Sequence, residues 1–223
     1  MAWPAWSKSH NKCTVCNQTE IAFLGSTSYT QGIYLLHIHV AAPLTITFGR
    51  FQGGRPIAIR PGDYLYIGSA LSQRGATSLA GRLLRHATRS DSRPPHAIRT
   101  PLTAQLQEMG LITPPKAVTP PSKRCFWHID YLLDQLAAEI TQIVALRTPQ
   151  RLEAQLARRL AHDPAVAPLV PGLGASDDPN ATHLLRVDAA TSWWQHLPTL
   201  LRELSINNQR EEPNESTTPS SCQ

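Results

Sequence analysis

The stretch Gly32-Ile33-Tyr34-Leu35-Leu36-His37-Ile38-His39-Val40 decides the fold class. Successive side chains of a strand point to opposite faces. Here one face would carry Tyr, Leu, Ile and Val, and the other Ile, Leu and two His. Because both faces are largely apolar and rich in aromatic and β-branched residues, the pattern predicts a strand inside a sheet.

The residues that follow predict more strands. Leu44–Phe48 alternates apolar and polar residues after a turn at 41–43, so we expect it to form an antiparallel hairpin with 32–40. Residues 57–59 are compatible with a short extension. Tyr64–Gly68 predicts a third strand, with Tyr64 and Tyr66 on one face.

The pattern then becomes helical. Residues 77–89 carry an apolar stripe at helical spacing opposite a basic face, with Thr77 or Ser78 as the N-cap. We also predict helices over 126–136, 149–161 and 191–204, the last bent near Pro198, and strands over 140–146 and 183–187. The fold class expected is α/β (α+β), with a small antiparallel or mixed sheet of about three main strands flanked by helices.

The domain boundaries follow from composition. Residues 1–28 and 207–223 are polar and aperiodic, which predicts flexible or disordered tails around one domain at 29–206. Seven prolines within 94–121 predict an inserted loop at about 90–122, with room for a short helix at 102–109.

The charge is unevenly distributed. The chain of 223 residues has a formal charge of +5, and residues 1–122 contain 12 basic but only 4 acidic side chains. The basic residues are 17 Arg and 4 Lys. Guanidinium groups suit phosphate oxygens, so this half favours an anionic partner such as nucleic acid, although codon bias would give the same composition.

Several protein classes lack support. No apolar run is long enough for a membrane span, and the first residues do not resemble a secretory signal. The four cysteines are scattered, so we expect a cytoplasmic protein without a disulfide framework; Cys13 and Cys16 have the spacing of half a zinc site only. The sequence contains no phosphate-binding loop, so we expect no nucleotide cofactor. It also contains no nucleophile elbow and no HExxH motif.

Five motifs in order carry a family resemblance. They are Gly32-Ile33-Tyr34, Tyr66-Ile67-Gly68-Ser69-Ala70, Arg82 with His86, Trp127-His128-Ile129-Asp130-Tyr131-Leu132, and Pro171-Gly172-Leu173-Gly174-Ala175-Ser176-Asp177 followed by His183-Leu184. The set resembles the GIY-YIG nuclease superfamily, and more narrowly a GIY-YIG-like family of unknown function that occurs alone or fused to endonuclease III. The resemblance covers about residues 30–188 and implies a metal-dependent endonuclease.

The chemistry of phosphodiester hydrolysis suits these residues. It needs a base for water, a cation for the developing charge on phosphate and often a metal ion. The expected catalytic residues are Tyr34, Tyr66, Arg82, His86 and Glu153, with either tyrosine as the base and Tyr34 slightly favoured. Glu153 would hold one Mg²⁺ or Mn²⁺, because such ions often take a single protein carboxylate.

We expect further contacts to nucleic acid, with DNA favoured over RNA, from Arg85, Arg89, Ser69 and His128. Ser69 replaces a Lys found in some superfamily members, and Asp178 stands where relatives continue with Cys-x-Cys. Two alternatives therefore remain: a nucleic-acid-binding module with little or no nuclease activity, and an enzyme acting on a small phosphorylated ligand.

Overall fold

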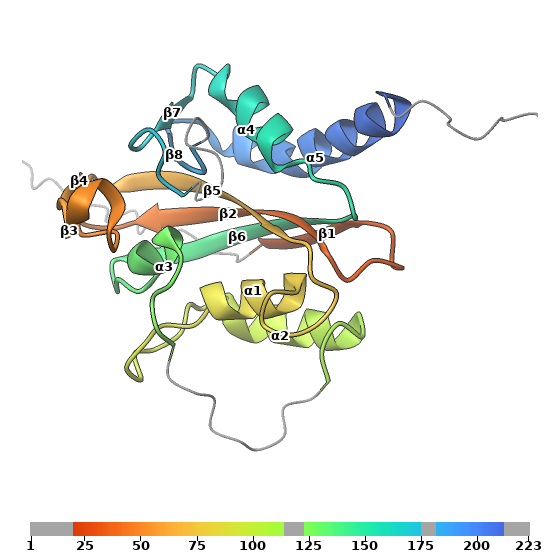
Figure 1. Cartoon of the computed structure of the whole chain (residues 1–223), viewed down its shortest axis with the longest axis horizontal. Helices are drawn as coiled ribbons and strands as arrows, with labels where there is room; N and C mark the ends of the chain where they lie inside the picture. The colour runs from red at the N-terminus through yellow and green to blue at the C-terminus, as the bar shows by residue number, and fades with distance from the viewer. Residues whose placement is uncertain (1–19, 114–122, 175–181, 212–223) are drawn as a thin grey trace, which may run out of the picture.

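A computed structural model describes residues 20–113, 123–174 and 182–211. Six strands form one mixed sheet in the order β1-β6-β2-β5-β8-β7, and helices cover both of its faces (Figure 1). The strands of this sheet are β1 (Glu20–Gly25), β2 (Gly32–Val40), β5 (Gly62–Ala70), β6 (Ala138–Arg147), β7 (Val166–Pro168) and β8 (Leu184–Val187). The mixed α/β class is thus as predicted, but the sheet is larger than the three main strands expected.

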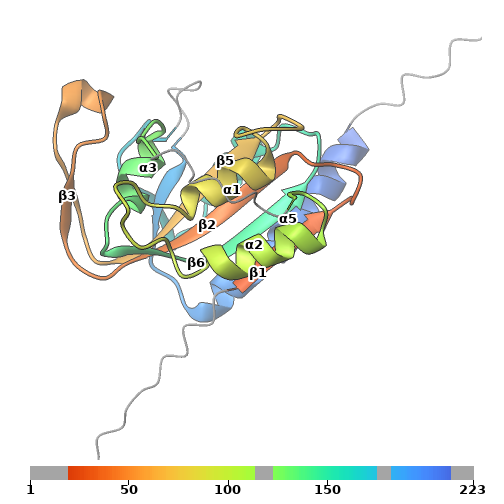
Figure 2. The ribbon, with the colours of Figure 1, turned by 90° about the horizontal axis from the view of Figure 1, so that it is seen from below.

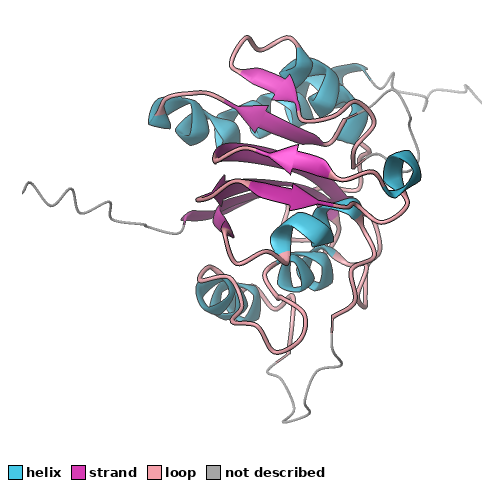
Figure 3. Cartoon of the chain, turned by 90° about the vertical axis from the view of Figure 1, so that its left-hand side faces the viewer, coloured by secondary structure: helices cyan, strands magenta, loops and turns pink. Residues whose placement is uncertain are grey.

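The helices form two layers. α1 (Leu79–His86), α2 (Arg99–Glu108) and α3 (His128–Leu133) lie on one side of the sheet, and α4 (Glu153–Ala161) and α5 (Thr191–Glu211) on the other. Figure 2, seen from below, shows α1 and α2 in front of the strands, and Figure 3 shows the sheet between its helical layers.

Strand β2 lies at the centre of the sheet, as its apolar pattern predicts. Tyr34 and Leu36 belong to the core beneath α1–α3, whereas Ile33 and Leu35 belong to the core beneath α4 and α5. Its neighbours are β5 and β6, both antiparallel to it. The strand therefore contributes to both cores, and this holds the two layers together.

The predicted hairpin of 32–40 with 44–48 is wrong. β3 (Leu44–Ile46) pairs instead with β4 (Ile57–Ile59) in a separate two-stranded sheet, joined by the short 3₁₀ helix η1 (Phe51–Gly54). This small sheet projects beside the main one (Figure 2). The central position next to β2 is taken by β6, a strand about a hundred residues later in the chain, which buries far more apolar surface.

The expected domain ends also need correction. Residues 20–25 of the predicted tail form β1, which pairs in parallel with β6, while residues 1–19 with Cys13 and Cys16 lie outside the described residues. At the other end, α5 continues through Pro198 to Glu211, past the predicted end at 204. The rest of the predicted tail, 212–223, is not described.

The proline-rich segment is not only an inserted loop, and the short helix allowed at 102–109 is confirmed. Its residues 99–108 form α2, and Ile98, Leu102 and Leu106 are fully buried in the core with α1. Prolines at 94, 95 and 101 do not interrupt this helix, because Pro101 occupies its first turn. Residues 114–122 lie outside the described part of the chain.

The remaining helices begin close to the predicted positions. Ser78 is the N-cap of α1, its hydroxyl oxygen accepting the Gly81 N–H at 3.2 Å. α4 begins at Glu153, later than the predicted start at 149, and α3 is shorter than the predicted 126–136. Within the described ranges, no helix has the length and apolar character needed to cross a membrane.

Candidate active site

Tyr34 and Tyr66 lie side by side on the α1 face of the sheet. Tyr34 is on β2 and Tyr66 on β5, and their ring centroids are 6.3 Å apart. Tyr34 is fully buried and lies directly over Gly68, where any Cβ would overlap the ring atoms. Gly32 is similarly constrained, because a Cβ there would overlap the Leu146 carbonyl oxygen. Steric crowding therefore explains why each tripeptide motif has glycine at this position.

The hydroxyl of Tyr34 is paired with His86, which α1 presents from its last turn. The Tyr34 oxygen lies 2.8 Å from His86 Nε2, and both side chains are buried. Burial lowers the pKa of His86, so the imidazole is neutral at neutral pH. Burial also raises the pKa of Tyr34, more than the nearby Arg82 charge lowers it. We therefore assign the phenol as donor and His86 Nε2 as acceptor.

Asp130 lies beside the other ring nitrogen of His86, Nδ1. Its carboxylate is completely buried, and Oδ1 lies 3.7 Å from His86 Nδ1 and 3.6 Å from Lys123 Nζ. Its Oδ2 accepts the backbone N–H groups of Phe126 and Trp127 at 3.0 and 3.1 Å. Burial alone would raise the pKa of Asp130, but His86, Lys123 and these N–H groups hold it well below its usual range. The carboxylate is ionised and favours the tautomer with a proton on His86 Nδ1.

Two arginines of α1 lie over the indole of Trp127. The guanidinium carbons of Arg82 and Arg85 are 4.5 and 4.9 Å from its ring centroid. Arg85 Nη2 also donates to Asp130 Oδ2 at 2.9 Å. Arg82 is only partly buried, and its Nε is a buried donor without a partner among the described residues. Arg82 thus has hydrogen-bonding capacity that the fold itself does not use.

Glu153 reaches the site from the opposite layer. It is the first residue of α4, and its Oε2 accepts the Ser69 hydroxyl at 2.5 Å while Oε1 accepts His183 Nδ1 at 3.0 Å. Burial acts to raise the pKa of Glu153, but the His183 and Ser69 hydrogen bonds and the Arg82 charge lower it overall. The carboxylate in turn contributes to the raised pKa of Tyr34 and Tyr66, so the two groups are electrostatically coupled.

The predicted catalytic residues therefore form two connected groups. Tyr34, Tyr66, His86 and Arg82 gather on one face, with the Tyr66 and His86 rings 5.9 Å apart. Glu153 is held at the edge of this group with Ser69 and makes no hydrogen bond to it. The sequence predicted that all five residues meet in one cleft; Glu153 instead lies in the α4 layer, on the other face of the sheet from the tyrosines.

The residues predicted to bind nucleic acid have different environments. The prediction for Arg89 is wrong, because its guanidinium is buried and bonded to Glu139 at 2.8 Å and to the Pro94 carbonyl at 2.8 Å. Ser69 is bonded to Glu153, and His128 Nδ1 accepts the Gly174 N–H at 3.3 Å. Arg85 is partly exposed.

Sequence reasoning gave no definite role to His183, Asp130 or Lys123. His183 immediately precedes β8 and is buried, which places it against Glu153. Its signals in the sequence were the His183-Leu184 part of the family resemblance and its position at the start of the predicted strand 183–187. Lys123 Nζ, also buried, donates to the Thr88 carbonyl at 2.7 Å, and no sequence pattern indicates this.

A metal ion has one plausible protein ligand here. No group of three His, Cys, Asp or Glu side chains within the described ranges has the arrangement of a metal site. Glu153 is 24% exposed, and each of its oxygens retains a lone pair beyond its hydrogen bond. This fits Mg²⁺ or Mn²⁺ held by one carboxylate and otherwise by water and substrate oxygens. It does not fit Zn²⁺ held by several side chains.

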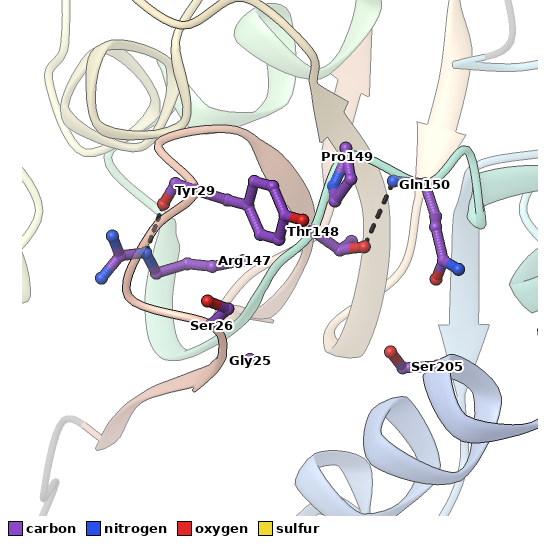
Figure 4. Close-up of a pocket in the computed structure, with 8 residues that line it drawn as sticks. All are labelled: Gly25, Ser26, Tyr29, Arg147, Thr148, Pro149, Gln150 and Ser205. Atoms are coloured by element: carbon purple, nitrogen blue, oxygen red, sulfur yellow. Dashed lines mark hydrogen bonds between the residues drawn. The ribbon is translucent and has the colours of Figure 1, made fainter. Parts of the chain in front are cut away.

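A separate polar cavity of about 440 Å³ lies where β1 and β6 end (Figure 4). Its only cation, Arg147, donates to the backbone carbonyl oxygens of Tyr29 and Thr27. The Thr148 hydroxyl accepts the Gln150 N–H. The Arg147 hydrogen bonds hold the 25–31 loop in place, and none of the lining residues belongs to the candidate site, so the cavity is separate from it.

Comparison with known families places the chain. The model of the domain of unknown function DUF123 matches residues 33–206, and the chain belongs to this family. No curated protein and no solved structure matches it. The matched segment contains all five predicted catalytic residues, Tyr34, Tyr66, Arg82, His86 and Glu153.

Proposed function

We propose that this member of the DUF123 family hydrolyses phosphodiester bonds in nucleic acid, with DNA the favoured substrate. The 2.8 Å contact between the Tyr34 hydroxyl and a buried, neutral His86 carries the proposal. A phenol beside a neutral imidazole, with an ionised carboxylate behind it, can transfer protons at neutral pH. The resemblance to the GIY-YIG superfamily supports the same conclusion.

Proton transfer would use both groups together. A phenol whose pKa is raised by burial does not ionise alone, so it takes a proton from water as it gives its own to His86 Nε2. The water oxygen then attacks phosphorus, the bond to the leaving oxygen breaks, and that oxygen takes up a proton from solvent. The His86 imidazolium returns its proton to solvent, which restores the site. Asp130 stabilises the imidazolium that forms, and Arg82 stabilises the negative charge on the phosphoryl oxygens.

Glu153 would hold the divalent ion, which when bound polarises the phosphate and lowers the pKa of its water. His183 and Ser69 orient this carboxylate by their hydrogen bonds. Such bonds to a metal ligand commonly fix its direction and raise the affinity of the site.

The test is cleavage by the purified full chain. Labelled branched, nicked and single-stranded DNA, and RNA, are incubated with Mg²⁺ or Mn²⁺ or with EDTA. We expect metal-dependent cleavage that falls by about 10²- to 10⁴-fold in Tyr34→Phe. Tyr64→Phe is the matched control, because Tyr64 lies two residues from Tyr66 in the same core but bonds only to the Arg60 carbonyl. A folded wild-type protein that cuts none of these substrates would contradict the proposal.

The burial of both tyrosines favours one second candidate, a nucleic-acid-binding module without cleavage. Tyr34 is 0% and Tyr66 5% exposed, so water must enter the site before either phenol can act on it. This candidate predicts salt-dependent binding that persists in Glu153→Gln, with no metal-dependent cleavage by the wild type.

A further inference from the structure

Phe126 is the most exposed of the large apolar side chains in the described part of the chain. It is 78% exposed, although it stands next to the candidate site. Its backbone N–H donates to buried Asp130, and its ring meets the indole of Trp127 edge to face, with centroids 5.6 Å apart. The ring is therefore held in solvent by a rigid support.

Cations surround this aromatic pair. Arg82 and Arg85 lie over the Trp127 ring, and the Arg85 guanidinium also donates to the Arg124 carbonyl. Arg124 itself is exposed. The carboxylate that contacts this segment, Asp130, is fully buried and bonded to Arg85, so the exposed charged groups named here beside Phe126 are all cations.

We propose that Phe126 stacks on an unpaired base of a single-stranded or locally opened nucleic acid, while Arg82, Arg85 and Arg124 contact its backbone. This inference rests on the proposed function, and it specifies the substrate class for that site. An exposed aromatic ring within a basic surface is the arrangement by which proteins bind single strands without reading their sequence.

The chemistry favours an unpaired base over other partners. In a duplex the base faces are covered by their neighbours, so the exposed ring can meet only backbone or groove edges. A protein partner would need a contiguous apolar patch, whereas the residues around Phe126 are arginines and a Trp already covered by them.

The test measures binding by fluorescence anisotropy of the full chain in EDTA, where cleavage is not required. The probes are a labelled single strand, the blunt duplex of the same sequence, and that duplex with a short single-stranded gap. The variants are Phe126→Ala, Phe126→Trp and Arg124→Ala. Tyr29→Ala serves as control because Tyr29 is an aromatic residue 40% exposed outside the site.

We expect Phe126→Ala to weaken single-strand and gap binding by about 5- to 150-fold and to leave duplex binding unchanged. Its salt dependence should match the wild type, because no phosphate contact is lost. Arg124→Ala should instead reduce the slope of log affinity against log salt by about 0.7 to 0.9 on all probes. Phe126→Trp should retain binding, and Tyr29→Ala should bind as the wild type does.

Single-strand binding that survives Phe126→Ala, or an equal loss on strand and duplex, would overturn the inference. Absence of any nucleic-acid binding by the wild type would overturn it together with the proposed function. Phe126-dependent binding without cleavage in Mg²⁺ or Mn²⁺ would contradict only the nuclease proposal.

Discussion

Replacing Gly68 by Ala tests whether the Tyr-Ile-Gly motif exists to seat Tyr34. Gly68 has no positive φ, so an Ala is compatible with its backbone. The new Cβ would however lie 2.5 Å from the Tyr34 hydroxyl oxygen and 2.6 Å from its Cε2. Since non-bonded carbon atoms pack at about 3.5–4.0 Å, the ring must move by about 1 Å.

The cost of that movement can be worked out from the packing. Tyr34 is fully buried, so the ring displaces other core side chains, and such overpacking costs about 1–3 kcal/mol. Loss of the hydrogen bond to His86 adds about 1 kcal/mol. We expect the free energy of unfolding to fall by about 2–4 kcal/mol, and the melting temperature to fall by about 6–12 °C at the middle of that range.

The assay is urea unfolding of a double-mutant cycle. In the Tyr34→Leu background the ring atoms that meet the new Cβ are gone, so Gly68→Ala should then cost less than about 1 kcal/mol. The proposed nuclease activity should fall with Gly68→Ala in the wild-type background. An equal cost in both backgrounds would refute the role assigned to Gly68.

Three further predictions concern other contacts. Burial acts to raise the pKa of Glu139, but hydrogen bonds from His96, Arg89 and the Ala97 N–H lower it overall, from 4.5 to about 2. The ionised carboxylate therefore stabilises the fold fully above pH 4.5, and this contribution is lost as the pH falls from 4.5 to 2. Glu139→Gln should therefore lose less stability than the wild type over that window, measured by urea unfolding at each pH; an unchanged pH dependence would contradict this. Ser78→Ala removes the cap that accepts the Gly81 N–H and should cost about 1 kcal/mol, whereas a loss below about 0.3 kcal/mol would argue against the cap. His183→Ala should raise the Mg²⁺ concentration for half-maximal cleavage by about 10- to 100-fold at unchanged saturating rate, because it leaves Glu153 unoriented; a change in rate alone would not fit.

The sequence predicted elements whose signals are local. The pattern of apolar side chains in 32–40 indicates both faces of the strand. In residues 79–86 an apolar stripe that begins after a Ser cap indicates the buried face of the helix. The spacing of Arg82 and His86 placed both on one helix beside the tyrosines. These features depend on neighbours within a few residues, so they can be recognised without the fold.

Features that depend on distant partners could not be predicted. Strand β6 takes the position assigned to 44–48 because of packing that no local pattern records. Arg89 was expected on an exposed basic helix face, in contact with nucleic acid, but Glu139 of β6 provides a buried partner for it. The prolines at 94–121 suggested a loop with a short helix at 102–109, and only the tertiary contacts of Leu102 and Leu106 show that this helix belongs to the core.

Strand β5 explains how one short motif serves two layers. Because its side chains alternate, Tyr66 and Gly68 face Tyr34 and His86, while Ser69 faces the opposite layer and bonds Glu153. A Lys at position 69, as in some GIY-YIG members, would place a cation beside that carboxylate and compete with a divalent ion for it. With Ser69 the carboxylate is oriented without being neutralised, and in the proposed function Arg82 supplies the positive charge for the phosphate. Under the proposed function Ser69 therefore changes which residue supplies that charge, and the missing Lys does not by itself favour the binding module without cleavage.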